Sequence, residues 1–250
     1  MDKPLIIANW KMNGSLVENA KRIEQLKVQA KDFDQVDVCV CPPYPYLSQV
    51  NELLATTPIQ VGAQNASAEN AGANTGEISV SMLKEFGCAY VLLGHSERRS
   101  LFQEDDRQIA AKCETALTVG LTPVVCVGET LEERQQGITE SVISVQVEAV
   151  LEQVGINGLA KVVIAYEPVW AIGTGETATP KQAQSVHAHI RGLLAECSPE
   201  VANTVPIIYG GSVKPDNARA LFRQEDVDGG LVGGASLDAD AFVQVCRAAC

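Results

Sequence analysis

Runs of apolar, largely β-branched residues recur along the whole chain and are separated by polar segments. Within each run the apolar positions are nearly continuous instead of alternating with polar ones, which is typical of parallel strands covered on both faces. The pattern therefore predicts a set of buried parallel strands. The eight runs cover residues 5–10, 36–42, 59–64, 90–95, 122–128, 162–167, 206–211 and 229–234.

Helical patterns lie between several of these strands. Ser15 and Glu18 have the spacing of a capping box, which predicts that a helix begins there. Thr179 can cap a second helix whose first turn holds Pro180. The apolar positions expected to face the core are Ala20, Ile23, Leu26 and Ala30 in the first helix and Val186, Ile190, Leu193 and Cys197 in the second.

The order of these elements predicts the fold class. Parallel strands need crossover connections, and eight strand-then-helix units in one uninterrupted chain are what a closed (β/α)8 TIM barrel requires. No linker or duplicated segment divides the 250 residues, so we expect one α/β barrel domain over residues 1–250. A doubly wound open sheet is the alternative, but its glycine fingerprint would follow the first strand, where this chain has NWKMNG (9–14).

The charge and the cysteines of the chain limit which classes of partner and which cellular compartment are expected. The net charge of −12 is spread without a basic block, which argues against nucleic acid and against a membrane surface as partners. The eight cysteines form no CxxC pair and are expected to be mainly small core residues in a reducing compartment. With only a short apolar LIIA stretch near the start, we predict a cytoplasmic protein. Arg98, Arg99 and the acidic run 104–106 are interpreted as a solvated helix start with internal ion pairs.

Polar side chains follow several of the predicted strands at their carboxyl ends, where barrel enzymes place their active sites. Taken singly, each has an ordinary explanation: a strand-end acid, a capping histidine, a surface amine or a tight turn. Together they are expected to meet at one rim, with glycine pairs after the last two strands forming a cradle for an anion. The groups are Asn9, Lys11, His95, Glu167, the GGS segment 210–212 and the pair Gly233 and Gly234.

These residue types fit one chemistry that needs neither a metal nor a cofactor. Glu167 can take a proton next to a carbonyl group, His95 can donate a hydrogen bond to the oxygen where charge grows, and Lys11 can stabilise that charge. This describes enolisation of a small phosphorylated ketose or aldose. The loop 168–175 is expected to close over it and exclude water. His187 and His189 lie two residues apart on a predicted helix, so they face different ways and do not suggest a metal site.

Six motifs in the same order match a known family. They are NWKMNG (9–14), LGHSERR (93–99), CVGE (126–129), AYEPVWAIGTG (165–175), YGGSV (209–213) and VGGASL (232–237). Over essentially its whole length, the chain resembles the triosephosphate isomerase family.

The resemblance implies a function and a role for each matching residue. It implies cofactor-free interconversion of dihydroxyacetone phosphate and D-glyceraldehyde 3-phosphate through an enediolate, in glycolysis and gluconeogenesis. It makes Glu167 the base, His95 the electrophile, Lys11 and Asn9 polar partners of the substrate, and Glu97 the carboxylate that orients the lysine. The implied donors to the substrate phosphate are Gly173, Ser212, Gly233 and Gly234.

The resemblance also implies a homodimer formed through the loop around Asn74 and Thr75. Residue 74 is asparagine where the family usually has an aromatic residue, and residue 176 is glutamate where lysine is common. Two other functions stay open at this point. One is another phosphate-binding barrel enzyme, such as a lyase or synthase, although a Schiff-base aldolase would want a lysine near the sixth strand. The other is a catalytically idle barrel that serves as a binding protein.

Overall fold

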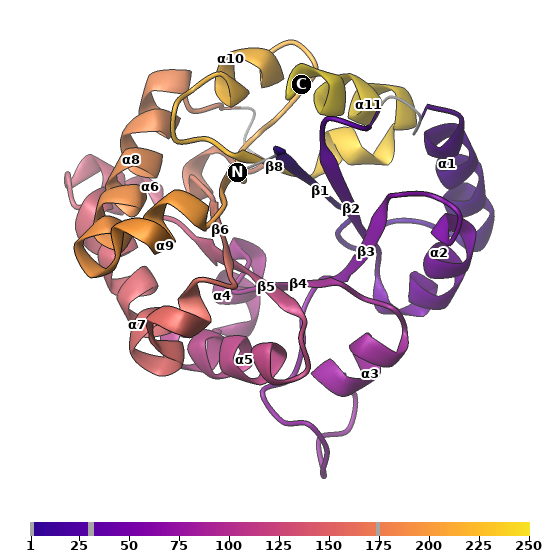
Figure 1. Cartoon of the computed structure of the whole chain (residues 1–250), viewed down its shortest axis with the longest axis horizontal. Helices are drawn as coiled ribbons and strands as arrows, with labels where there is room; N and C mark the ends of the chain where they lie inside the picture. The colour runs from indigo at the N-terminus through magenta and orange to yellow at the C-terminus, as the bar shows by residue number, and fades with distance from the viewer. Residues whose placement is uncertain (1–2, 30–32, 174–175) are drawn as a thin grey trace.

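The computed structural model describes residues 3–29, 33–173 and 176–250. Within them, eight parallel strands pair in chain order, and β1 also pairs with β8, so the sheet closes into a barrel (Figure 1). The barrel predicted from the apolar runs is therefore confirmed. The strands are β1 Leu5–Asn9, β2 Asp37–Cys41, β3 Gln60–Ala63, β4 Tyr90–Leu93, β5 Thr122–Val127, β6 Val163–Tyr166, β7 Ile207–Tyr209 and β8 Gly229–Val232.

Helices surround the barrel as an outer ring (Figure 1). The helices lie in the connections between successive strands or follow the last strand. Such crossovers let successive strands run in the same direction, as parallel pairing requires. The α-helices are α1 Leu16–Gln29, α2 Leu47–Leu54, α3 Val80–Glu85, α4 Ser96–Phe102, α5 Asp106–Thr118, α6 Leu131–Gln135, α7 Thr139–Leu159, α8 Pro180–Cys197, α9 Pro199–Thr204, α10 Ala218–Phe222 and α11 Ala239–Ala248. Short 3₁₀ helices are η2 Tyr44–Tyr46, η3 Val169–Ala171 and η4 Gly234–Leu237.

Two apolar layers explain why the strands read as continuous hydrophobic runs. Successive side chains of a strand point to opposite faces. In β1, Ile6 and Ala8 belong to the layer between the strands and the helices, whereas Leu5 and Ile7 belong to the layer inside the barrel. Both faces of the strand are thus buried. The inner layer is completed by Cys39, Cys41, Leu92, Val124, Cys126, Val163, Ala165, Ile208 and Leu231.

The two predicted helix starts are confirmed. At α1 the Ser15 hydroxyl accepts a hydrogen bond from the Glu18 backbone N–H at 3.2 Å. At α8 the Thr179 hydroxyl accepts from the Gln182 N–H at 3.2 Å, while the Gln182 side chain accepts from the Thr179 N–H at 2.9 Å. Each cap satisfies backbone donors that have no partner inside the helix.

The expected core positions of these helices are confirmed only in part. In α1, Ile23 and Leu26 are buried, Ala20 is half-buried, and Ala30 lies outside the described residues. In α8, Val186 and Ile190 are buried, but the prediction is wrong for the last two positions. The buried face turns toward Ala183, His187 and Leu194, which leaves Leu193 half-buried at its margin, and Cys197 is exposed at the helix end.

The ion pairs expected near α4 form, but they are not all solvated. Arg98 Nε lies 2.7 Å from Glu104 Oε1. Lys112 Nζ lies 2.6 Å from the same oxygen and 3.0 Å from Asn65 Oδ1. Glu104 is only 8 % exposed. The interpretation as a solvated helix start is therefore wrong for Glu104, because this carboxylate is buried against Lys112 of α5, whose ammonium is also held by Asn65 from the loop after β3.

A buried histidine makes the stability of the fold depend on pH. His187 is fully buried on α8, where its ring packs edge-on against Tyr166 at 5.8 Å between ring centres. Burial lowers the pKa of His187 from its ordinary 6.5 to about 4. Between these values the unfolded chain binds a proton that the folded chain does not bind, so folding is disfavoured as the pH falls.

We expect this histidine to remove up to about 3 kcal/mol from the free energy of unfolding between pH 6.5 and pH 4. His187→Gln should flatten that part of the pH dependence, because the variant has no imidazole to protonate on unfolding. Urea titrations across this range, at one protein concentration, measure the difference. His189→Gln on the same helix is the matched control. Equal pH slopes for the parent and His187→Gln would contradict the expectation.

Candidate active site

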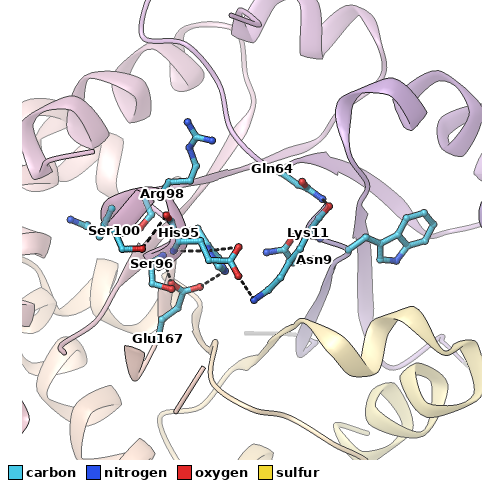
Figure 2. Close-up of polar contacts among 12 residues, drawn as sticks. Asn9, Lys11, Gln64, His95, Ser96, Arg98, Ser100 and Glu167 are labelled. Carbon is cyan, nitrogen blue, oxygen red and sulfur yellow. Dashed lines mark hydrogen bonds and ion pairs between the residues drawn. The ribbon is translucent and has the colours of Figure 1, made fainter. Parts of the chain in front are cut away.

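A cavity of about 570 Å³ lies at the carboxyl ends of the strands. The residues that the sequence placed around the substrate line it and come from five separate segments of the chain, whereas Glu97, expected to orient Lys11, is not among the lining residues. In Figure 2, Lys11, His95 and Glu167 point toward a common space. The predicted residues that line the cavity are Asn9, Lys11, His95, Glu167, Gly173, Ser212, Gly233 and Gly234.

Lys11 follows the end of β1 in an unusual backbone conformation. Its φ angle is 51°, in the left-handed region that residues other than glycine rarely adopt. Its N–H donates to Asn9 Oδ1 at 3.0 Å, and its carbonyl oxygen accepts from Gln64 Nε2 at 2.8 Å. Its ammonium lies 2.6 Å from Glu97 Oε1. The surrounding contacts thus hold a strained residue so that its charge faces the cavity.

His95 caps the N-terminus of α4 with its ring. Nδ1 accepts a hydrogen bond from the Glu97 backbone N–H at 3.2 Å. Because Nδ1 is the acceptor, the proton of the neutral ring is on Nε2. Nε2 lies 3.1 Å from Glu167 Oε1 (Figure 2). The helix start therefore fixes the tautomer that presents an N–H donor to the cavity.

Glu167 follows β6 and is almost completely buried, with 1 % of its surface exposed. The backbone N–H of Ser96 donates to its Oε2 at 2.8 Å, so one carboxylate oxygen is held and the other faces His95. A Cβ added at Gly210 would lie 2.8 Å from Glu167 Cγ. Glycine at this position therefore leaves the space that the carboxylate occupies.

Cys126 of β5 lies inside the barrel beside Glu167. Burial, together with the nearby Glu167 carboxylate, raises the pKa of the Cys126 thiol well above its usual value. The thiolate is the reactive form of cysteine, and here it is disfavoured. The thiol is therefore a neutral neighbour of the carboxylate and not a second nucleophile of the cavity.

Glycines after β7 and β8 and in the loop after Glu167 line a glycine-rich end of the cavity. Gly233 precedes the 3₁₀ helix η4, and a Cβ added there would come within 3.4 Å of Lys11 Cε. Gly173, with φ 72°, follows η3 in the loop after Glu167. Main-chain N–H groups near glycines can approach an anion closely. The arrangement thus places backbone and the Lys11 ammonium where a phosphate could lie.

A buried carboxylate anchors the beginning of the loop that follows Glu167. Glu129 is fully buried, and its Oε1 accepts from Trp170 Nε1 at 2.9 Å, Tyr166 Oη at 3.1 Å and Arg134 Nη1 at 2.9 Å. Residues 174–175 of this loop lie outside the described residues. The first half of the loop is therefore tied to the turn after β5.

Three groups of the site were not found from the sequence. The Ser96 N–H is a backbone donor, which every non-proline residue carries, so no sequence signal marks it. Gln64, which directly follows β3, donates a hydrogen bond to the Lys11 carbonyl oxygen. Glu129 stands in the quoted CVGE motif, but nothing in that motif predicts its three donors.

Among the residues that the structure describes, no group of three or more His, Cys, Asp or Glu side chains could hold a metal ion. As predicted, His187 and His189 face different ways: His187 is buried, whereas His189 lies 3.0 Å from the Ser144 hydroxyl. In the same parts of the chain, no helix is long and apolar enough to span a membrane.

Comparison with known proteins gives one consistent result. A family model described as triosephosphate isomerase matches residues 4–249. Triosephosphate isomerases of Dechloromonas aromatica and Thiobacillus denitrificans are each 55 % identical to this chain over 249 residues, which cover 100 % of this chain and 100 % and 99 % of theirs. That of Hydrogenovibrio crunogenus is 55 % identical over 250 residues, covering 100 % of this chain and 99 % of its own.

Proposed function

The chain belongs to the triosephosphate isomerase family and is an enzyme that interconverts triose phosphates, and we propose that Glu167, His95 and Lys11 carry out its proton transfer. The substrates are dihydroxyacetone phosphate and D-glyceraldehyde 3-phosphate, and the reaction is a step of glycolysis and gluconeogenesis. The observation that carries the proposal is the meeting of these three side chains at one cavity.

Glu167 takes the proton from the carbon next to the carbonyl group and returns it to the neighbouring carbon. Its burial removes competing water, and its free oxygen lies on the side of His95. The resulting enediolate carries negative charge on its oxygens. His95 donates its Nε2–H to these oxygens, and the Lys11 ammonium stabilises the charge in a cavity of low dielectric.

The substrate phosphate lies at the glycine-rich end of the cavity. Backbone N–H groups of Gly173, Ser212, Gly233 and Gly234 donate to it, and Asn9 fixes the backbone that presents Lys11. Gly173 belongs to the loop 168–175, which closes over the substrate. Closure keeps water away from the enediolate, which would otherwise lose its phosphate.

An assay of the purified protein tests the function. With dihydroxyacetone phosphate as substrate and a chelator present, D-glyceraldehyde 3-phosphate should form without any added cofactor. Cleavage or condensation products would instead indicate a lyase or synthase. Binding of the substrate without turnover would indicate an idle barrel that acts as a binding protein.

The protein forms a homodimer through the loop around Asn74 and Thr75. This loop, between β3 and α3, extends away from the body of the barrel (Figure 1), and both residues are exposed in the single chain. Large apolar side chains are also exposed: Met12 is 95 %, Leu101 72 % and Phe102 63 % accessible. Burial of these side chains against a second copy of the chain would favour association.

An aromatic residue at position 74 should strengthen the dimer. It would bury roughly 150–250 Å², and at about 25 cal/mol per Å² the gross gain is several kcal/mol before ordering costs are subtracted. Asn74→Phe is therefore expected to lower the dimer dissociation constant. Sedimentation velocity over a dilution series of both proteins measures it. Equal constants, or tighter association of the parent, would place residue 74 outside the contact or show its amide well paired there.

The compartment is the cytoplasm. All eight cysteines are free thiols, and six of them are buried. Free thiols are typical of a reducing compartment.

A further inference from the structure

A side-chain amide on the outer ring holds the backbone directly beside the active site. Gln146 lies on α7 and is half-buried. Its Oε1 accepts a hydrogen bond from the Gly128 N–H at 2.8 Å, and its Nε2 donates to the Gly128 carbonyl oxygen at 3.1 Å. Both backbone polar groups of Gly128 are thus hydrogen-bonded by one side-chain amide, in the way that a neighbouring strand satisfies backbone groups within a sheet.

Gly128 in turn lies against the backbone of Glu167. A Cβ added to Gly128 would overlap the carbonyl oxygen of Glu167 and come within 2.8 Å of its carbonyl carbon. On either side of this contact the two segments are hydrogen-bonded, from the Glu167 N–H to the Val127 oxygen at 2.7 Å and from the Val169 N–H to the Glu129 oxygen at 3.1 Å. A shift of Gly128 would therefore move the backbone of Glu167.

The carboxylate has little freedom to compensate for such a shift. The Ser96 N–H holds Oε2 at 2.8 Å, and His95 Nε2 lies 3.1 Å from Oε1. Both partners belong to the start of α4 and not to the β5–β6 pair. The position of the carboxylate thus depends on two supports, α4 at its oxygens and Gly128 at its backbone.

We propose that Gln146 is a positioning residue for Glu167, acting through Gly128. It touches neither the cavity nor the substrate, since it is absent from the residues that line the cavity. The inference depends on the proposed role of Glu167 as the base. It adds that the side-chain amide of Gln146, on an outer helix and eighteen positions along the chain from Gly128, keeps that base in position for catalysis.

Gln146→Met tests the inference, because methionine has a similar length and helix propensity but supports neither hydrogen bond. A misplacement of about 1 Å can cost roughly a hundredfold in rate. We therefore expect kcat to fall about tenfold to a hundredfold. The inhibition constant of inorganic phosphate should stay within about twofold of the parent, because the glycine-rich end of the cavity is not involved. If Gln146 had only a structural role, the variant would have a lower melting temperature, but kcat would not fall while the inhibition constant of phosphate stayed the same.

Gln153→Met is the matched control. Gln153 lies on the same helix and donates a hydrogen bond to Glu114 at 2.7 Å, away from the cavity, so its kcat should equal that of the parent. Gln146→Glu is the second variant should Gln146→Met not fold: its carboxylate keeps the acceptor for the Gly128 N–H but loses the donor to the carbonyl oxygen, and kcat should again fall with phosphate inhibition unchanged.

Two results would overturn the inference: a kcat within twofold of the parent in the folded variant, or equal losses of kcat and phosphate affinity. A comparison with Glu167→Gln separates this failure from that of the proposed function. If Glu167→Gln loses turnover while the Gln146 variants keep it, only the positioning role is wrong. If Glu167→Gln keeps its turnover, the role of the base itself is wrong.

Discussion

Glu167→Gln is expected to lower kcat by about 10²- to 10⁴-fold, the usual contribution of a general base. Glutamine keeps the shape of the side chain and can still accept the Ser96 N–H, which donates to Glu167 Oε2 at 2.8 Å. It cannot accept the proton from the substrate carbon. Since the glycine-rich end of the cavity is unchanged, inhibition by inorganic phosphate should be nearly the same as in the parent.

Steady-state kinetics in both reaction directions measure this effect. Glu148→Gln, an exposed glutamate on α7, is the control for the change in charge. A Glu167→Gln enzyme with kcat within about tenfold of the parent would exclude Glu167 as the base, because even the smallest typical contribution is about a hundredfold.

Lys11→Met should have the second large effect and should change both kinetic constants. An ammonium about 4 Å from a unit negative charge contributes ~4 kcal/mol at an effective dielectric constant of about 20. Lys11 faces both the place of the enediolate and the glycine-rich end, where a Cβ on Gly233 would come within 3.4 Å of its Cε. We expect kcat to fall and KM to rise, with a combined loss in kcat/KM of roughly 10²- to 10³-fold.

The control for Lys11→Met is Lys161→Met. Lys161 is exposed and lies just before β6, at the opposite end of the barrel, so the variant changes the net charge equally without touching the cavity. Equal kinetic losses in the two variants would mean that overall charge, and not the local ammonium, determines the rate. A rise in KM with unchanged kcat would limit Lys11 to binding the phosphate.

The fold could be predicted because its strands carry a strong local signal. Both faces of strands such as β1 are buried, so the apolar runs are nearly uninterrupted. The helix starts at Ser15 and Thr179 were predicted for a similar reason, since the cap and its partner are three residues apart. The far end of α8 was mispredicted, because the direction in which a helix faces depends on its neighbours in space.

The site residues could be predicted from the sequence because the barrel places the strand ends at one rim. Asn9, Lys11, His95 and Glu167 lie at or just after the carboxyl ends of predicted strands, and all line the cavity. The groups that hold these residues in position could not be predicted. The Ser96 N–H has no sequence signature, and Gln146 reaches Gly128 only through the packing of α7 against the barrel. In this protein the positions of the proposed reacting groups follow from topology, whereas the groups that orient them follow from tertiary contacts.

Deuterium incorporation tests the central claim most directly. In D₂O, the parent enzyme should convert dihydroxyacetone phosphate to D-glyceraldehyde 3-phosphate that carries deuterium at carbon 2, because the proton held by Glu167 exchanges with solvent before it returns to the substrate. Proton NMR of the product measures this. Glu167→Gln should incorporate deuterium at least about a hundredfold more slowly, in step with its loss of turnover. Equal rates of incorporation in the parent and in Glu167→Gln would contradict the account, because another group would then be moving the proton.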